Sequence, residues 1–149
     1  MKVINKLINS QVIEVISGGS NGSIIVLKLR NIQTHEFSLF IYCTWRLETE
    51  TEVLSGNNES PNGNLLYETQ LLLNDKIVFI EKNIFNDIFI QFESKKKLNI
   101  FCDITPKCDS KYYTKNWTIC DIAENKCYSA ELNKNIQISA YEYLSFFPQ

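Results

Sequence analysis

The stretch FSLFIYCTW, residues 37–45, alternates between two sets of side chains along its whole length. The odd-numbered set is wholly apolar and consists of Phe37, Leu39, Ile41, Cys43 and Trp45. Side chains of an extended strand point alternately to its two faces, so this set predicts a strand with one face in a core. The even-numbered set includes Phe40 and Tyr42 and is still fairly apolar, so we expect that face to be covered as well.

The same period of two recurs through most of the chain. It predicts further strands over residues 23–30, 65–73, 76–81, 88–93, 98–103, 117–122, 126–132 and 136–141. Turn-forming residues separate several of them: Asn74 with Asp75, Asn125, and residues 133–135. Residues 3–15 fit either a short helix or an edge strand. Because no long 3.6-residue period is visible, we predict a mainly β chain with little helix, forming an antiparallel β-sandwich or a barrel-like domain.

The strand pattern contains an approximate internal repeat. A shift of 63 positions places Leu27 on Ile90, and a shift of 59 places Leu39 on Leu98 and Cys43 on Cys102. Residues 1–149 are therefore predicted to form a single domain, built from two related β units at about residues 13–45 and 76–103. The alternative is that any two β-hairpins share such a pattern, and the sequence leaves both explanations open.

Length and charge limit the class of protein. The chain has 149 residues, 44% of them hydrophobic, which suits one domain with a substantial core. Its formal net charge is −2 and its basic residues are scattered, which disfavours direct binding of nucleic acid. The N-terminal residues lack the apolar core of a signal peptide, and no apolar stretch approaches a membrane span. We therefore expect a cytoplasmic protein that does not bind membranes.

The cysteines do not indicate a metal site. There are five of them, and an odd number without an export signal predicts free thiols. The last four have the spacing C-x5-C-x11-C-x6-C, whereas structural zinc sites pair cysteines two to four residues apart. Cys43 and Cys102 lie within apolar strands, where a free cysteine behaves as a small buried hydrophobe. We predict no metal and no cofactor.

The residues also do not assemble a recognisable catalytic motif. The glycine-rich segment GGSNGS leads into the strand pattern IIVLKL and lacks the lysine and helix of a phosphate-binding loop. The single histidine, His35, is expected to be a solvated loop residue. A carboxylate pair drawn from Asp103, Asp109 and Asp121 stays open as an alternative, since strand ends could bring such residues together. Our expectation is a protein that is not an enzyme.

Two long polar segments, residues 48–64 and 105–116, are predicted to be loops, and loops of this length are often functional. The first is acidic and the second carries adjacent tyrosines. Exposed aromatic and acidic residues favour a contact surface for a basic partner. The candidate contact residues are Glu48, Glu50, Glu52, Glu59, Asp109, Tyr112 and Tyr113. Trp45 and Trp117 are instead expected to be core anchors.

The strings SGGSNGSIIVLKL, CTWRLE, DIFIQF, LNIFCDIT and NWTI resemble small bacterial immunity-like proteins of contact-dependent and polymorphic toxin systems. The resemblance spans residues 13–122 and rests on strands and the two tryptophans. It implies an immunity protein that neutralises a cognate toxin, with a basic nuclease domain as the expected partner. It implies no catalytic residues. The alternatives are a β-barrel that binds a small ligand and a carboxylate-pair hydrolase.

Overall fold

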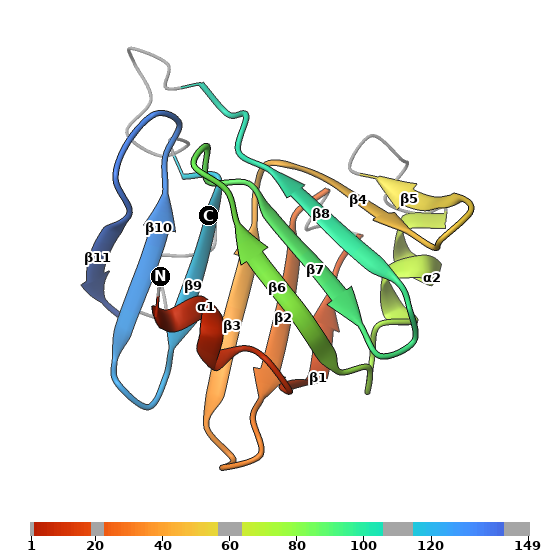
Figure 1. The fold of residues 1–149 in the computed structure, drawn as a ribbon, viewed down its shortest axis with the longest axis horizontal. Helices are drawn as coiled ribbons and strands as arrows, with labels where there is room; N and C mark the ends of the chain where they lie inside the picture. The colour runs from red at the N-terminus through yellow and green to blue at the C-terminus, as the bar shows by residue number, and fades with distance from the viewer. Residues whose placement is uncertain (1, 19–22, 57–63, 106–114, 142–149) are drawn as a thin grey trace.

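Two antiparallel β-sheets pack face to face in the computed structural model, which describes residues 2–18, 23–56, 64–105 and 115–141 (Figure 1). Sheet A contains, in spatial order, β1 (Gln11–Ile16), β2 (Ile25–Arg30), β3 (Glu36–Ile41), β9 (Trp117–Asp121), β10 (Lys126–Ala130) and β11 (Gln137–Ala140). Sheet B contains β5 (Val53–Gly56), β4 (Thr44–Glu48), β8 (Lys97–Phe101), β7 (Ile88–Phe92) and β6 (Ile77–Lys82). The sheets are not closed into a barrel, so the prediction of a β-sandwich is confirmed.

The core lies between the two sheets. Trp45 and Trp117 are its largest fully buried side chains, and one continuous apolar cluster surrounds them. Their predicted role as core anchors is therefore confirmed. The even-numbered face of β3 is covered too, because Phe40 forms a second buried cluster with Val26, Cys120 and Cys127 on the other side of sheet A. Burial of apolar side chains at about 25 cal/mol per Å² is the main stabilising term for such a sandwich.

The stretch 37–45 is not one strand, and this prediction was wrong. Residues up to Ile41 belong to β3 in sheet A, and those from Thr44 belong to β4 in sheet B. The chain crosses between the sheets at Tyr42 and Cys43, whose N–H groups both donate to the carbonyl oxygen of Asn116. The period of two survives the crossing because both sheets turn one face to the same core.

Two further sequence predictions are corrected. Residues 65–73 do not form a strand, because α2 (Asn64–Gln70) occupies most of them. The buried positions there, Thr69 and Leu72, are three residues apart while Leu71 is exposed, which is helical spacing. The segment 48–64 is not simply a loop, since it contains β5. Residues 3–15 supply both predicted alternatives, because α1 (Lys2–Lys6) precedes β1.

The two halves of the chain follow the same path. Within β2 and β3, Leu27 pairs with Leu39; within β7 and β8, Ile90 pairs with Leu98. After β3 the chain crosses into sheet B and forms β4 beside β8; after β8 it crosses into sheet A and forms β9 beside β3. The registers therefore match the shifts seen in the sequence, while descent from a duplication remains a prediction.

The tryptophans repeat this correspondence at the two crossings. Trp45 pairs with Ile100 across β4 and β8, and Trp117 pairs with Ile41 across β9 and β3. The indole Nε1–H of Trp45 donates to the carbonyl oxygen of Ser23 at 2.9 Å. That of Trp117 donates to the carbonyl oxygen of Asn86 at 2.7 Å. Residues 23 and 86 are separated by the same shift of 63 positions as Leu27 and Ile90, so both indoles anchor to equivalent points of the backbone.

Asparagine occupies most of the described non-glycine positions that have a left-handed backbone conformation. Seven described non-glycine residues have positive φ, and five of them are asparagines: Asn9, Asn74, Asn86, Asn125 and Asn133. Asparagine tolerates the left-handed region better than most residues because its short side chain hydrogen-bonds locally. The turn positions predicted at residues 74, 125 and 133–135 are thereby confirmed, although Asn74 connects α2, not a strand, to β6.

We predict that replacing either indole destabilises the fold to a similar degree. Trp45→Phe and Trp117→Phe each leave a void beside the core and a carbonyl without its donor, partly buried at Ser23 and buried at Asn86, which costs about 1–4 kcal/mol. Urea unfolding followed by circular dichroism measures this loss. A variant pair that differed widely, with one near wild-type stability, would contradict the equivalence of the two crossings.

Candidate functional site on the outer face of sheet B

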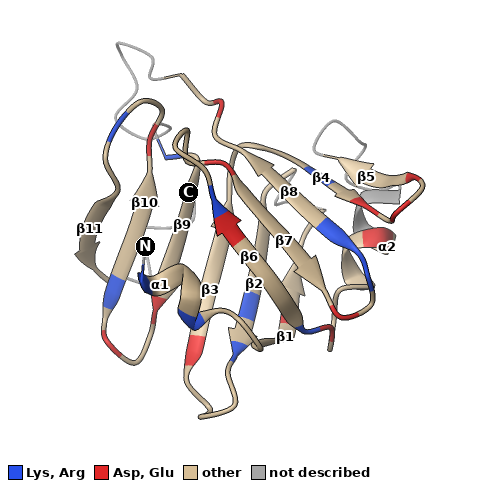
Figure 2. Ribbon diagram, viewed as in Figure 1, with Lys and Arg blue, Asp and Glu red and all other residues tan. Residues whose placement is uncertain are grey.

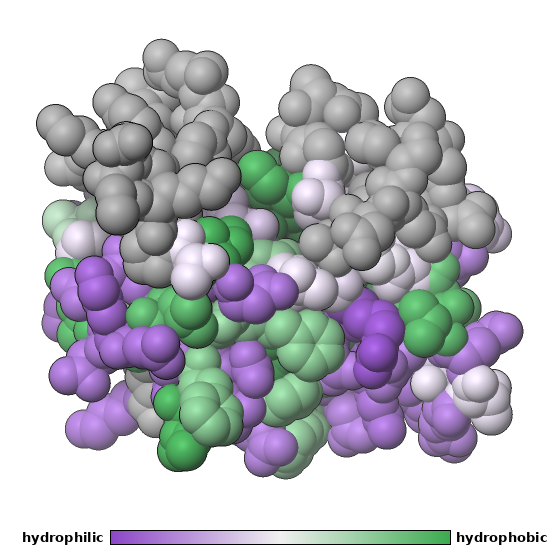
Figure 3. All heavy atoms as spheres, turned by 90° about the horizontal axis from the view of Figure 1, so that it is seen from above, coloured by the Kyte–Doolittle hydropathy of each residue, from purple (hydrophilic) through white to green (hydrophobic). Residues whose placement is uncertain are grey.

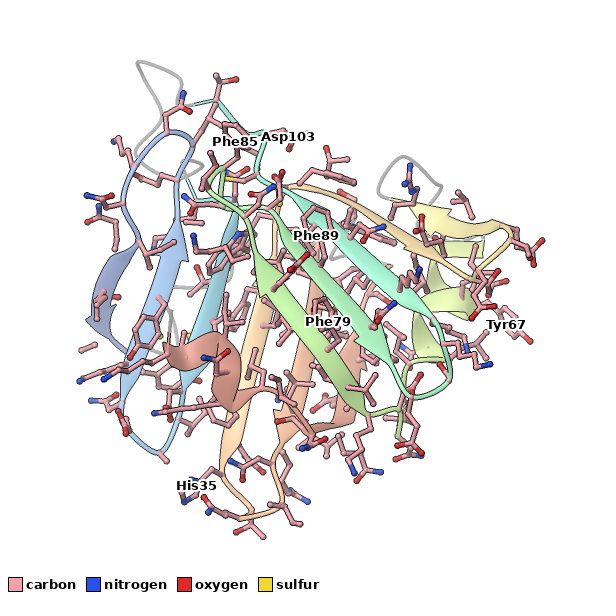
Figure 4. The ribbon with its side chains drawn as sticks, in the orientation of Figure 1. His35, Tyr67, Phe79, Phe85, Phe89 and Asp103 are labelled. Carbon is pink, nitrogen blue, oxygen red and sulfur yellow. The ribbon has the colours of Figure 1, made fainter. Side chains whose placement is uncertain are left out.

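Three phenylalanines cross the solvent-facing side of sheet B on a diagonal. Phe79 on β6 pairs with Gln91, while Phe89 on β7 pairs with Asn99 of β8, two residues before Phe101. We call Phe79, Phe89 and Phe101 the aromatic diagonal. Phe79 is 43% exposed and the other two are half-buried. The rings of Phe89 and Phe101 lie edge to face with centroids 6.5 Å apart. Figure 4 shows Phe79 and Phe89 on neighbouring strands of this sheet.

Polar and charged side chains border the aromatic diagonal. The guanidinium carbon of Arg46 lies 5.9 Å from the ring centroid of Phe101, a cation–π distance. Its Nε also donates at 2.9 Å to the carboxylate of Glu48, two residues further along β4. Aromatic residues and arginine with a polar rim are the composition typical of protein-binding surfaces.

A loop with exposed apolar side chains joins β6 to β7 at one end of this face. Ile84 is 87% and Phe85 63% exposed, while Asn83 holds the loop by accepting at Oδ1 from the N–H groups of Phe85 and Asp87. Asn31 accepts in the same way from Gln33 and His35 between β2 and β3. Apolar residues stand out among hydrophilic ones in the end view of Figure 3.

The three predicted acidic contacts Glu48, Glu50 and Glu52 come together on the hairpin that joins β4 to β5, and we call them the acidic hairpin (Figure 2). The N–H of Thr49 donates to the carbonyl oxygen of Glu52 and closes this turn. Glu50 and Glu52 are exposed. The Glu48 carboxylate accepts from Arg46, so the carboxylates of Glu50 and Glu52 at the tip are the ones that face an outside partner.

The other predicted site residues have different outcomes. Glu59, Asp109, Tyr112 and Tyr113 lie outside the described residues. His35 is exposed in the loop between β2 and β3, as expected (Figure 4).

The structure separates the carboxylates of the proposed acid pair that it describes. Asp103 follows β8 and accepts from the Thr44 backbone N–H and hydroxyl, and the next residue, Ile104, hydrogen-bonds to Asn116 just before β9 begins. Asp121 ends β9 at the opposite end of that strand and is buried against Lys6 at 3.1 Å. The Lys6 pKa is raised, chiefly by its hydrogen bond to Asp121. The two carboxylates therefore do not form a pair.

Four of the cysteines are described, and all four are buried free thiols. Burial raises the pKa of Cys43 well above its ordinary value, and the nearby carboxylates of Asp103 and Asp87 act in the same direction. Burial raises the pKa of Cys102 to about 11. Cys120 and Cys127 face each other across β9 and β10, and burial raises the pKa of both. No group of three or more potential ligands among the described residues could hold a metal ion.

A groove of about 830 Å³ opens near the turns that connect α1 to β1 and β7 to β8. Its lining is largely polar and includes Arg30, Asp75 and Ser94. Arg30 is engaged by Glu36 at 2.8 Å, and Asp75 accepts from the Ser94 hydroxyl and N–H. These side chains thus hold neighbouring segments of the groove wall together.

Comparisons with protein-family models, with curated proteins and with solved structures found no match. Among the described residues, neither helix has the length and apolar character needed to cross a membrane.

We predict that sheet B tolerates substitution of a phenylalanine on its outer face but not of one on its inner face. Phe79→Ser on the outer face should cost less than about 1 kcal/mol, because nearly half of the side chain is already exposed. Phe92→Ser on the inner face should cost about 3 kcal/mol or more, because Phe92 is 1% exposed in the core. Urea unfolding of the two variants measures both; a large loss from Phe79→Ser would mean that this ring serves the core.

We predict that the protein loses stability above pH 9. A thiol whose pKa rises from 9.0 to about 11 on folding, as for Cys102, stabilises fully below pH 9. Above pH 9 the unfolded thiols ionise first, so the unfolded state binds fewer protons and the free energy of unfolding falls. Urea unfolding at pH 8 and pH 10 should show a loss of about 1 kcal/mol or more. The Cys120→Ala variant lacks one of these thiols, so its free energy of unfolding should fall less between pH 8 and pH 10 than that of the wild type. Equal stability of the wild type at both pH values would contradict this linkage.

Proposed function

We propose that this protein works by binding another protein through the outer face of sheet B, and that the partner is a bacterial toxin which it neutralises. The observation that carries the binding proposal is the aromatic diagonal. The inner faces of β6, β7 and β8 already fill the core with Ile77, Ile80, Ile88, Ile90, Phe92, Leu98 and Ile100. The outer phenylalanines lie beyond that core, where large aromatic rings are most useful as contacts for a partner.

The charges beside the aromatic diagonal favour a partner of definite chemistry. Glu50 and Glu52 project from the acidic hairpin at the β4 side of the same sheet. A partner that suits this face has an apolar centre for the phenylalanines and a basic rim for the two carboxylates. Complementary charge raises the association rate and orients the two surfaces. A nuclease domain, whose substrate is anionic, presents such a basic surface.

The toxin part of the proposal rests on the sequence resemblance to immunity-like proteins. Neutralisation would follow if sheet B covered the surface on which the toxin binds its substrate. Binding beside that surface, with steric exclusion of the substrate, would have the same effect. Both forms need a rigid face, and a sheet packed on a continuous core provides one.

The test is a binding and growth experiment with the product of the gene next to the one that encodes this chain. We expect that product to arrest growth, this chain to restore it, and calorimetry to give a submicromolar dissociation constant. Phe89→Ser should weaken binding by about 10-fold or more, as expected for an interface hot spot. Glu50→Lys with Glu52→Lys should mainly slow association.

Ile32→Ser is the matched control, because Ile32 is 91% exposed but lies in the loop between β2 and β3 of sheet A, and not in a strand of sheet B. It should bind as the wild type does. A neighbouring product that is not toxic and binds nothing at submicromolar strength would end the toxin proposal. A complex that Phe89→Ser and the charge-reversed hairpin leave unchanged would instead move the contact surface away from sheet B.

A further inference from the structure

The four sheet edges of the sandwich are treated differently. At β1, Gln70 Nε2 of α2 donates to the Val15 carbonyl at 2.9 Å, and Val12 exchanges backbone hydrogen bonds with residues 74 and 75. At β6, Ile77 exchanges backbone hydrogen bonds with residues 9 and 10, and a bulge follows it. At β5, α2 packs against the strand. Helices, bulges and backbone pairing of this kind protect an edge from further strands.

The fourth edge, β11, has none of these protections among the described residues. All four of its residues are exposed, and none is charged or a proline. Its pairing with β10 runs without a bulge from Gln137 to Ala140. It is the edge strand of sheet A at the end opposite β1 (Figure 1). A regular, uncharged edge of this kind is the geometry that accepts another strand.

The backbone of β11 has hydrogen-bonding groups aimed outward. The N–H of Tyr141 donates to the Asn125 carbonyl. The backbone N–H and C=O groups of the odd-numbered residues of β11 therefore point toward β10. Hydrogen-bonded positions alternate along an antiparallel strand, so the N–H and C=O of Ile138 and Ala140 point away from β10. These groups form a two-residue repeat that another antiparallel strand can match.

The even-numbered residues 136, 138 and 140 also carry apolar side chains, which form a row along this edge. Ile138 pairs with Tyr128 of β10, which packs against the core between the sheets. Ile136, just before the strand, packs against that core too. Ile138 itself is 64% exposed. An added strand would therefore satisfy outward backbone groups and cover an apolar side chain at once.

We propose that the edge of β11 is a self-association site, at which β11 of a second copy of this chain pairs antiparallel about a two-fold axis through Ile138. In that register Ile138 faces Ile138 of the second copy, and Ile136 faces its Ala140. Residues directly opposite in an antiparallel pair lie on the same face, so the apolar row is continuous. Because β11 has no charge, self-pairing brings no like charges together.

A four-residue edge buries a small area, so the dimer should be weak and concentration-dependent. Sedimentation velocity of the full chain from about 5 µM to about 500 µM is the measurement, a range that brackets micromolar dissociation constants. We expect the mass to rise from the monomer toward twice that value and to stop there.

Charge-swapped variants test the register. Ile138→Lys and Ile138→Glu should each weaken association by about 10-fold or more, since like charges then face each other across the axis. An equimolar mixture of these two variants should recover the dimer, because opposite charges then face each other. Val53→Lys is the matched control: Val53 is 58% exposed on β5, an edge strand of the other sheet that α2 contacts, and this variant should dimerise as the wild type does.

Urea unfolding of each variant establishes that β11 still folds. A wild type that stays monomeric at the highest concentration would overturn the proposal, as would a dimer that survives Ile138→Lys. Mass that grows beyond the dimer would also overturn it, since a two-fold contact closes on itself. None of these outcomes depends on the toxin partner or on sheet B.

Discussion

Two buried indoles hold the structure at the two places where the chain changes sheets. Trp45 and Trp117 each lie at the start of a strand that has just crossed, and each donates its Nε1–H to the backbone of an earlier loop in the same half of the chain. A tryptophan buried with its N–H satisfied contributes a large apolar surface without the cost of an unpaired donor. The crossings are thereby fixed, and with them the pairing of β3 with β9 and of β8 with β4.

In this arrangement the inner side chains of both sheets form the core, whereas the outer side chains of sheet B do not contribute to it. Each half contributes a three-stranded meander to one sheet and its next strands to the other, so neither half buries its apolar face alone. The inner rows of both sheets are committed to the shared core. The outer row of sheet B is free of that requirement, and its phenylalanines with Arg46 form a rigid surface suited to recognition.

The two short helices contact three of the four sheet edges. α2 packs beside β5 and hydrogen-bonds to β1, while α1 packs on β6. Sheet A has one strand more than sheet B, and that strand, β11, extends to an edge with an apolar residue still exposed. The face of sheet B and the edge of β11 lie on different sheets, so a protein partner and a second copy of this chain can be considered independently.

The sequence alone determined most of the strands, the core side of β3, β7 and β8, and the turn positions at Asn74, Asn125 and Asn133, because alternation and left-handed turns are local properties. It also identified both tryptophans as core residues and grouped Glu48, Glu50 and Glu52, which are neighbours along the chain, although it predicted a loop where the structure has the β4–β5 hairpin. It could not reveal that residues 37–45 divide between two sheets, because both sheets face one core and the alternation continues unbroken. It also missed the aromatic diagonal and the open edge of β11. Residues 79, 89 and 101 become neighbours only through the registers of three strands, and an edge is defined by what the rest of the fold leaves uncovered.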